Sequence, residues 1–235
     1  MEKKYPMRIN KYLAEEKHST RRGADELISD GRVFINGRLA VLGEMVNAKD
    51  KVEVRFRVGK KEKYIYLAYN KPRGIVTHSA DVGDEDINDK VKIEGVFPIG
   101  RLDKDSSGLI ILTNDGRITD RLLSPDHYHE KEYLVTTRGK LRSSFKQKME
   151  AGVKIGNDKT RPSKVEILGE DKFKITLTEG KNHQIRRMCA ALFQEVETLK
   201  RIRVMNIDIG SLKENEYRKI EGEELKIFLR SLGLL

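Results

Sequence analysis

The sequence predicts an α+β protein with a small N-terminal domain of two helices and a small sheet, followed by a larger domain with a mixed, largely antiparallel sheet and flanking helices. Helical spacing of apolar residues at the start of the chain gives way to short alternating strands. From residue 64 onward, longer apolar strands are separated by segments with helical spacing. Strands and helices do not alternate strictly, so a doubly wound parallel sheet is not expected.

Two short helices are predicted at the start of the chain. Residues 7–16 place Ile9 and Leu13 four positions apart, as on one face of a helix. A second helical pattern begins at Thr20, whose side chain suits the N-cap position. Gly31 fits the position just after the end of this helix, where a left-handed backbone is common.

A small sheet follows the helices. The apolar residues 33–35 precede Asn36 and Gly37, a dipeptide that suits a two-residue hairpin because both residues tolerate positive φ. Residues 52–56 then alternate apolar and charged side chains, which is typical of a half-buried strand.

The polar segment 59–63 is the predicted linker, which gives domains at residues 1–60 and 61–235. The first of these contains fourteen Lys and Arg residues against nine Asp and Glu residues. Such an excess on a compact unit favours contacts with the phosphates of a folded RNA, although a solvated basic face would also explain it.

The second domain is predicted to contain both strands and helices. Its apolar runs and helical patterns are separated by turn residues. The expected strands cover residues 64–69, 109–112, 133–135 and 173–177, and the expected helices cover residues 117–123, 143–151 and 182–193.

The segment GRLDKDSSGLIILTNDG, residues 100–116, carries the strongest chemical signal. Gly100 and Gly108 permit tight backbone paths on either side of Asp103, and the apolar run after them anchors this loop to the core. Arg101 can keep a neighbouring carboxylate ionised, and a positioned carboxylate can act as a nucleophile or a base. Local chemistry leaves open a second interpretation, a surface turn with an ion pair.

Composition limits the partners of the chain. The formal net charge is +10, which favours a polyanionic partner such as nucleic acid. No apolar run of about 18 residues is present and the start is too polar for a signal peptide, so we expect a cytoplasmic protein without a membrane partner. The single Cys189 cannot form an internal disulfide, and without other cysteines or a His cluster no metal site is expected.

Taken together, the motifs resemble those of the RsuA-type ribosomal RNA pseudouridine synthases. The resemblance covers nearly the whole chain, and the N-terminal segment resembles an S4 RNA-binding domain. The wording of the motifs is most similar to the branch that modifies 23S rRNA. The motifs that carry the resemblance are NKPRGIV at 70–76, GRLDKDSSGLIILTNDG at 100–116, HEKEYLVT at 129–136, LTEGKNHQIRRM at 177–188 and LKRIRVMNIDIG at 199–210.

The resemblance implies a reaction and the residues that perform it. Uridine within RNA is isomerised to pseudouridine after the base has left its stack, and no cofactor is consumed. Asp103 matches the essential aspartate, Tyr133 matches the active-site tyrosine, and Arg186 matches an arginine that would keep Asp103 charged and oriented. Leu199 resembles the apolar residue that covers the base.

Further residues are expected to contact the RNA. On the catalytic domain these are Arg101, His183 and Arg187, and on the S4-like domain they are Arg21, Arg22 and Arg32. The expected substrate is 23S rRNA and the expected state a monomer. A site in 16S rRNA or tRNA is the first alternative, and a non-catalytic RNA-binding ribosome-assembly factor is the second. A hydrolase is disfavoured because paired carboxylates and metal ligands are not apparent.

Overall fold

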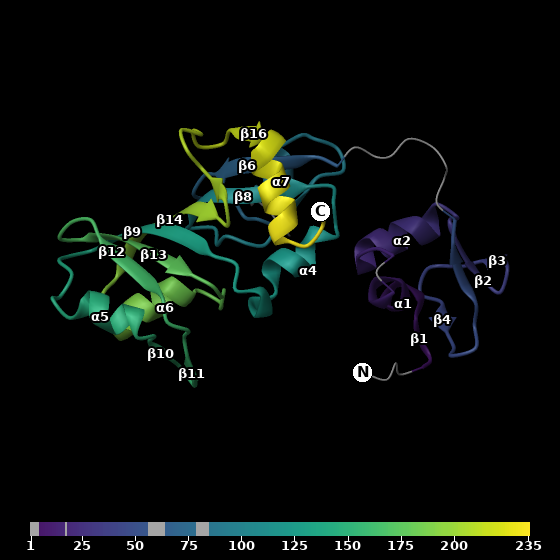
Figure 1. Cartoon of the computed structure of the whole chain (residues 1–235), viewed down its shortest axis with the longest axis horizontal. Helices are drawn as coiled ribbons and strands as arrows, with labels where there is room; N and C mark the ends of the chain where they lie inside the picture. The colour runs from purple at the N-terminus through teal and green to yellow at the C-terminus, as the bar shows by residue number, and fades with distance from the viewer. Residues whose placement is uncertain (1–4, 17, 56–63, 79–84) are drawn as a thin grey trace. The chain divides into compact units, whose positions relative to one another are not determined.

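The chain forms two compact units. The structure, a computed structural model, describes residues 5–16, 18–55, 64–78 and 85–235 (Figure 1). Contacts divide the chain into Met1–Lys63 and Tyr64–Leu235. The predicted linker at 59–63 and the last residue of the predicted strand, Phe56, lie outside the described residues.

The first unit contains the two predicted helices, although the first begins at Ile9 because Met7 and Arg8 pair with Met45 and Val46 as strand β1. Thr20 caps the second helix, because its Oγ1 accepts a hydrogen bond of 3.1 Å from the backbone N–H of Gly23. Gly31 follows the helix with φ +67°, as its position in the sequence predicts. The elements of this unit are β1 (Met7–Arg8), α1 (Ile9–Glu15), α2 (Arg21–Ser29), β2 (Val33–Ile35), β3 (Arg38–Leu39), β4 (Met45–Val46) and β5 (Val52–Val54).

The predicted hairpin is also present. Asn36 and Gly37 both have positive φ, 52° and 84°, and connect β2 to β3. β5 pairs with the other edge of β2, so these three strands form the small sheet. Ile9, Leu13 and the buried face of α2 pack together with β2 in one apolar core. This unit therefore has an apolar core of its own.

Within the described part of the second unit, nine strands form one mixed sheet in the order β12-β13-β9-β14-β8-β6-β16, with β15 on β14 and β7 on β8. All neighbours are antiparallel except β14 and β8. The α+β class with a largely antiparallel sheet is therefore confirmed. The strands of this sheet are β6 (Tyr66–Lys71), β7 (Phe97–Ile99), β8 (Ser107–Thr113), β9 (Lys131–Thr137), β12 (Lys164–Ile167), β13 (Lys172–Leu177), β14 (Val196–Val204), β15 (Ile207–Asp208) and β16 (Tyr217–Lys219).

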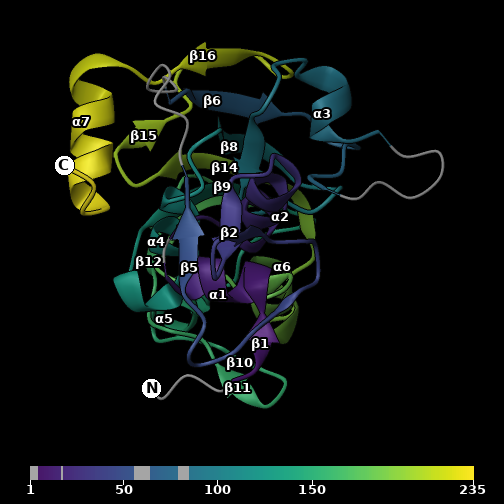
Figure 2. The ribbon, with the colours of Figure 1, turned by 90° about the vertical axis from the view of Figure 1, so that its right-hand side faces the viewer.

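Helices cover both faces of this sheet. Leu109 and Ile111 of β8 face a core that includes α4 and α7, whereas Ile110 and Leu112 face a core that includes α3. Figure 2 shows α3 and α7 on opposite sides of β6 and β16, and α5 and α6 pack on β9, β12 and β13. The remaining elements are α3 (Ile87–Lys90), α4 (Ile118–Leu123), the 3-10 helix η1 (Pro125–His127), α5 (Phe145–Glu150), the hairpin β10 (Lys154–Ile155) and β11 (Asp158–Lys159), α6 (Gln184–Ala191) and α7 (Gly222–Ser231).

A buried carboxylate closes the end of β8. Asp115 is fully buried, and it accepts hydrogen bonds from the Tyr66 hydroxyl at 2.5 Å and from Arg117 Nε and Nη2 at 2.8 Å. Burial by itself would raise the pKa of Asp115, but the hydrogen bonds from Arg117 and Tyr66 outweigh it and hold that pKa below its usual value. The network fixes the chain between β8 and α4.

Among the described residues, no helix is both long and apolar enough to cross a bilayer. Cys189 is buried in the core under α6, and burial raises the pKa of its thiol to about 12. Such a buried thiol is a structural core residue.

Candidate active site

Asp103 lies on the loop between β7 and β8, and this loop is held from two directions. Thr77 Oγ1 donates to the carbonyl of Leu102 at 2.7 Å and accepts from its N–H at 3.0 Å. The N–H of Gly74 donates to the carbonyl of Lys104 at 2.8 Å. Both neighbours of Asp103 are thus fixed by the segment that follows β6, while its own side chain remains 38% exposed. A carboxylate held this way is oriented and still accessible.

His183 is the group that faces this carboxylate. Its Nδ1 lies 3.7 Å from Oδ2 of Asp103, an ion pair when the imidazole is protonated. The residue has φ +47° and ψ +32°, a left-handed conformation uncommon for a residue with a Cβ, directly before α6 begins. The start of α6 therefore brings an imidazole to Asp103.

Arg186 is placed differently from expectation. Its Nη2 donates to the carbonyl of Asp105 at 3.2 Å and its Nη1 to the carbonyl of Val196 at 3.3 Å. In the structure the guanidinium thus connects α6 to the backbone two residues beyond Asp103 and to the start of β14. Its contact is with the loop that carries the aspartate, rather than with the carboxylate itself.

Tyr133 and Leu199 lie on one face of the sheet. In the antiparallel pair of β9 with β14, Tyr133 is opposite Arg201 and Val135 is opposite Leu199. Residues opposite each other or two apart share a face, so all four point to the side of α6. Arg201 is aligned with Gly108 of β8, which puts Tyr133 about two strand spacings, or roughly 10 Å, from the start of β8. The face between Tyr133 and β8 is the floor on which a base could lie beside Asp103.

Gly108 is required at the point where β8 meets β14. It has φ +109°, and an added Cβ would lie 2.6 Å from the backbone nitrogen of Arg201. The same arginine is 5% exposed, and its Nε donates to the carbonyl of Leu109 at 2.7 Å. The sequence motif thus needs this glycine for a close approach of two strands.

Lys71 is a site residue that the sequence did not predict. It is fully buried at the end of β6, opposite Gly108, and its Nζ donates to the carbonyls of Ile75 at 2.6 Å and Pro72 at 3.0 Å. Burial lowers the pKa of Lys71 to about 8, although the negative charge of Asp103 opposes the shift. Burying a charged ammonium costs free energy unless the charge is paired. The buried Lys71 near Asp103 therefore indicates a role at the site.

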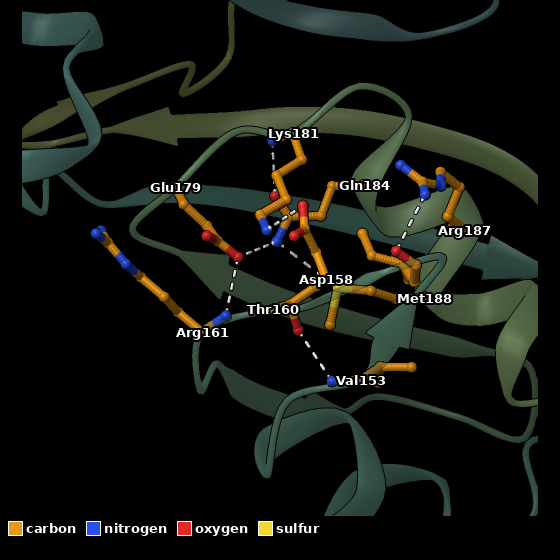
Figure 3. Close-up of polar contacts among 10 residues, drawn as sticks. Val153, Asp158, Thr160, Arg161, Glu179, Lys181, Gln184, Arg187 and Met188 are labelled. Atoms are coloured by element: carbon orange, nitrogen blue, oxygen red, sulfur yellow. Dashed lines mark hydrogen bonds and ion pairs between the residues drawn. The ribbon is translucent and has the colours of Figure 1, made fainter.

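A second unpredicted feature is a buried network that fixes the loop before α6 (Figure 3). Glu179 Oε1 accepts from Nε2 of Gln184 at 2.8 Å and from the N–H of Arg161 at 2.9 Å. Oε1 of Gln184 in turn accepts from the N–H of Lys181 at 2.8 Å. Glu179 and Gln184 are both buried, so the segment leading to His183 is rigidly tied down. Nothing in the local sequence reveals this pairing.

Arg187 and Arg101 complete the predicted residues of this unit. Arg187 Nη2 donates to the carbonyl of Ile155 at 3.1 Å, so it joins α6 to the β10–β11 hairpin (Figure 3). Arg101 is exposed, two residues before Asp103. The structure therefore gives Arg187 a structural contact and leaves Arg101 accessible.

Two hollows have basic residues in their linings. One of about 290 Å³, beside the Asp103 loop, is lined in part by the basic residues Arg73, Lys172 and Lys200 and by the acidic residues Asp105 and Glu214. The other, of about 340 Å³ on the first unit, is lined by Pro6, Met7, Arg8, Asn10, Lys11, Arg21 and Met45. Basic side chains around a hollow can hold RNA phosphates.

The three arginines predicted on the first unit lie on or after α2. Arg21 and Arg22 are exposed in its first turn. Arg32 lies 3.2 Å from Oδ2 of Asp30, which partly neutralises it. Of the three, the two in the first turn of α2 offer free cationic surface.

Comparison with known proteins shows the family of the chain. The model of the RNA pseudouridylate synthase family matches residues 65–191, and that of the S4 domain matches residues 7–52. The chain belongs to the RNA pseudouridylate synthase family. The resemblance to RsuA-type synthases seen in the motifs is thereby confirmed, and the chain is a pseudouridine synthase, an isomerase.

Relatives within the pseudouridylate synthase family share most of the chain. The dual-specificity RNA pseudouridine synthase RluF of Escherichia coli (strain K12) is 41% identical over 223 residues, 93% of this chain and 77% of the relative. The ribosomal large subunit pseudouridine synthase B of Bacillus subtilis (strain 168) is 34% identical over 229 residues, covering 93% and 94% of the two chains. A crystal structure of a pseudouridylate synthase is similar with a TM-score of 0.69 and 30% identity, and covers 96% of this chain and 99% of that one.

Proposed function

We propose that this pseudouridine synthase modifies 23S rRNA and that Asp103 is its essential carboxylate. The observation that carries the proposal is the pinned loop before β8, which presents Asp103 next to His183 and the start of α6. The relative from B. subtilis is named for the large ribosomal subunit. The E. coli relative is named dual-specificity, so more than one RNA should be assayed.

The reaction needs a carboxylate at the ribose and a pocket that retains the detached base. The bond from C1′ to N1 breaks, the uracil turns, and a bond from C1′ to C5 forms. The C5 proton is lost and N1 gains one, so the product is an isomer and no electrons are exchanged. Asp103 acts on the nucleotide as a nucleophile or a base, by attack at C1′, by addition to C6 of the ring or by removal of the 2′ proton.

Tyr133 and Leu199 are suited to hold the flipped uracil. They come from neighbouring strands and share one face, so an aromatic ring and an apolar side chain can contact a base between them. Both also pack against the core under α5 and α6, which fixes their positions. Base stacking there would compensate part of the cost of removing the uridine from its helix.

Cationic groups lie around the Asp103 loop and attract RNA. Lys71 and Arg201 are buried close to the start of β8. Arg186 acts as a positioning residue that holds the Asp103 loop against α6. Arg101 and the accessible edge of His183 are placed to meet the strand that carries the target uridine.

The two units divide the work. Residues 1–60 bind RNA through the basic first turn of α2, with Arg21 and Arg22, and residues 61–235 perform the isomerisation. The enzyme acts as a monomer in the cytoplasm and uses no cofactor. Light scattering of the purified chain should give a single species near its mass of 27.0 kDa, and a dimer mass would contradict the monomer.

Substitution of Asp103 tests the assignment of the carboxylate. Asp103→Asn should bind 23S rRNA as the wild type does but form no pseudouridine. Asp105→Asn is the matched control, because Asp105 lies on the same loop, its backbone carbonyl contacts Arg186, and its exposed carboxylate lies 4.0 Å from Nε of Arg73. Pseudouridine formation by Asp103→Asn at the wild-type rate would refute the role of Asp103.

Deletion of the gene tests the substrate. Pseudouridines mapped across total RNA should lose a site in 23S rRNA, and the plasmid-borne enzyme should restore it. Loss of a site in 16S rRNA or tRNA alone would contradict the large-subunit assignment. If no site is lost in any RNA, a role as an assembly factor would gain support.

A further inference from the structure

An exposed tyrosine stands on the loop between η1 and β9. Tyr128 is 60% exposed and has φ +54° and ψ +29°, a left-handed conformation that is uncommon for an aromatic residue. The guanidinium carbon of Arg161 lies 4.2 Å from the centroid of its ring. One side of the ring therefore rests on a cation, and the ring remains largely open to solvent.

Arg161 is anchored at both ends. Its Nη1 donates to the carbonyl of Pro125 at 2.7 Å, and its backbone N–H donates to the buried Glu179. Figure 3 shows its side chain extending away from the Glu179 and Gln184 pair. Tyr128 thus stacks on a guanidinium that is itself fixed, so little entropy remains to be lost when a ligand binds.

The surroundings of Tyr128 are aromatic and basic. His127 and His129 stack on each other with 5.7 Å between ring centroids. Burial, and then the charges of His127 and Lys131, lower the pKa of His129. On this loop Asp126 is acidic and exposed, and Glu130 is paired with Arg203 at 2.9 Å. An exposed aromatic ring beside a guanidinium is typical of surfaces that bind unpaired nucleotides.

The position of this cluster distinguishes it from an ordinary surface contact between arginine and an aromatic ring. Arg161 is hydrogen-bonded to Glu179, and Glu179 to Gln184, which directly follows His183 beside Asp103. Tyr128 and His183 therefore share one rigid support, so a nucleotide on Tyr128 would have a fixed position relative to the side chain that faces Asp103.

We propose that Tyr128, backed by Arg161, is a stacking platform for a second, unpaired base of the substrate RNA, distinct from the uridine held at Asp103. The inference rests on the proposed function, because it assumes an RNA substrate. The free part of the ring stacks on the base, and the guanidinium of Arg161 attracts the adjoining phosphate. The platform thereby selects RNA in which a neighbour of the target is also unstacked.

Fluorescence can test the contact directly, because the chain contains no tryptophan. Tyr128→Trp supplies a single indole that can stack as the phenol does. Titration of this variant with in vitro transcribed 23S rRNA should quench its emission. Phe193→Trp is the matched control, since Phe193 is 78% exposed, has φ +62° and lies 5.1 Å from the guanidinium of Arg142. Its emission should not change.

Kinetics give a second test. Tyr128→Ala should raise the KM for the transcript by at least about fivefold, as expected for loss of one stacked base, while kcat at saturation stays unchanged. Tyr128→Phe, which keeps the ring, should retain the wild-type KM. An unchanged KM in Tyr128→Ala, or unquenched emission of Tyr128→Trp when filter retention shows the RNA to be bound, would overturn the proposal.

The outcomes separate this proposal from the substrate assignment. If the wild type modifies the transcript but Tyr128→Trp is not quenched, the platform is wrong and the function stands. If Tyr128→Trp is quenched but the wild type leaves the transcript unmodified, the platform is supported as an RNA contact and the 23S rRNA assignment fails.

Discussion

Replacing Gly108 by alanine should separate the strands that carry the active site. An added Cβ would lie 2.6 Å from the backbone nitrogen of Arg201, whereas ordinary contacts of this kind are about 3.5 Å. The carbonyl oxygen of Arg201 would lie closer still, so β14 would have to recede by at least about 1 Å, which lengthens a typical N–H···O distance of about 2.9 Å beyond the range of a hydrogen bond. The parallel pairing of β8 with β14 would therefore weaken at the base of the Asp103 loop.

Two costs contribute to the expected loss of stability. The positive φ of +109° makes any residue with a Cβ strained by about 1–3 kcal/mol. Overpacking against Arg201 adds about 1–3 kcal/mol. Gly139→Ala isolates the first cost, because Gly139 has φ +107° and no atom lies within 4 Å of an added Cβ. Gly108→Ala should therefore be the less stable variant by about 1–3 kcal/mol.

Urea unfolding of the full chain can measure this difference. With a slope of about 1–3 kcal/mol per molar urea, the midpoint of Gly108→Ala should fall roughly 1 M below that of Gly139→Ala. Pseudouridine formation should be lost in Gly108→Ala and kept in Gly139→Ala under conditions where both are folded. Equal midpoints and equal activities would refute the reasoning that the close approach at Gly108 holds the site together.

Three further predictions concern buried polar groups. Because the pKa of Lys71 is about 8, its ammonium is charged below that pH and neutral above it, so single-turnover activity should fall above about pH 8; constant activity up to pH 10 would contradict this. The pKa of Asp115 is held below its ordinary value of 3.8, so the stability from its pairing with Arg117 is present above pH 4 and should be lost as the pH falls through the lowered pKa. Urea unfolding at pH 7 and pH 3 can measure this loss. The variant Asp115→Asn should not show it. Gln184→Ala removes a partner of the buried Glu179 and should destabilise the protein by about 1–3 kcal/mol, which calorimetry would detect as a lower Tm.

Local chemistry predicted the first unit well. Thr20, Gly31 and the Asn36-Gly37 turn each depend on contacts with near neighbours in the sequence, and each is found as expected. β14 was missed, because its sequence mixes apolar residues with several charges. Arg201 is buried there only because its Nε reaches the carbonyl of Leu109 on another strand. Such a strand can be recognised only when its partners are known.

The site was predictable only in part. The motif around Asp103 indicates the carboxylate, but the residues that hold it come from distant segments. Lys71 was missed because a lysine at a strand end is normally exposed, and here the turn after β6 supplies two carbonyls to its ammonium. The direction of Arg186 depends on where the backbone of Asp105 passes, which spacing along the chain does not determine.

The pairing of β8 with β14 also bears on how the chain can change in length. Lys200 aligns with Ser107 and Arg201 with Gly108, so the start of β8 has a fixed register on β14. Because Arg201 is also opposite Tyr133, this register fixes the start of β8 relative to Tyr133. One residue inserted between Asp103 and Gly108 would shift the carboxylate by up to about 3.3 Å relative to Tyr133. Insertions between β8 and β9 would leave this register untouched. Homologous chains should therefore hardly vary in length between Asp103 and Gly108, whereas changes between β8 and β9 should spare the segments that hold Asp115 and Tyr128.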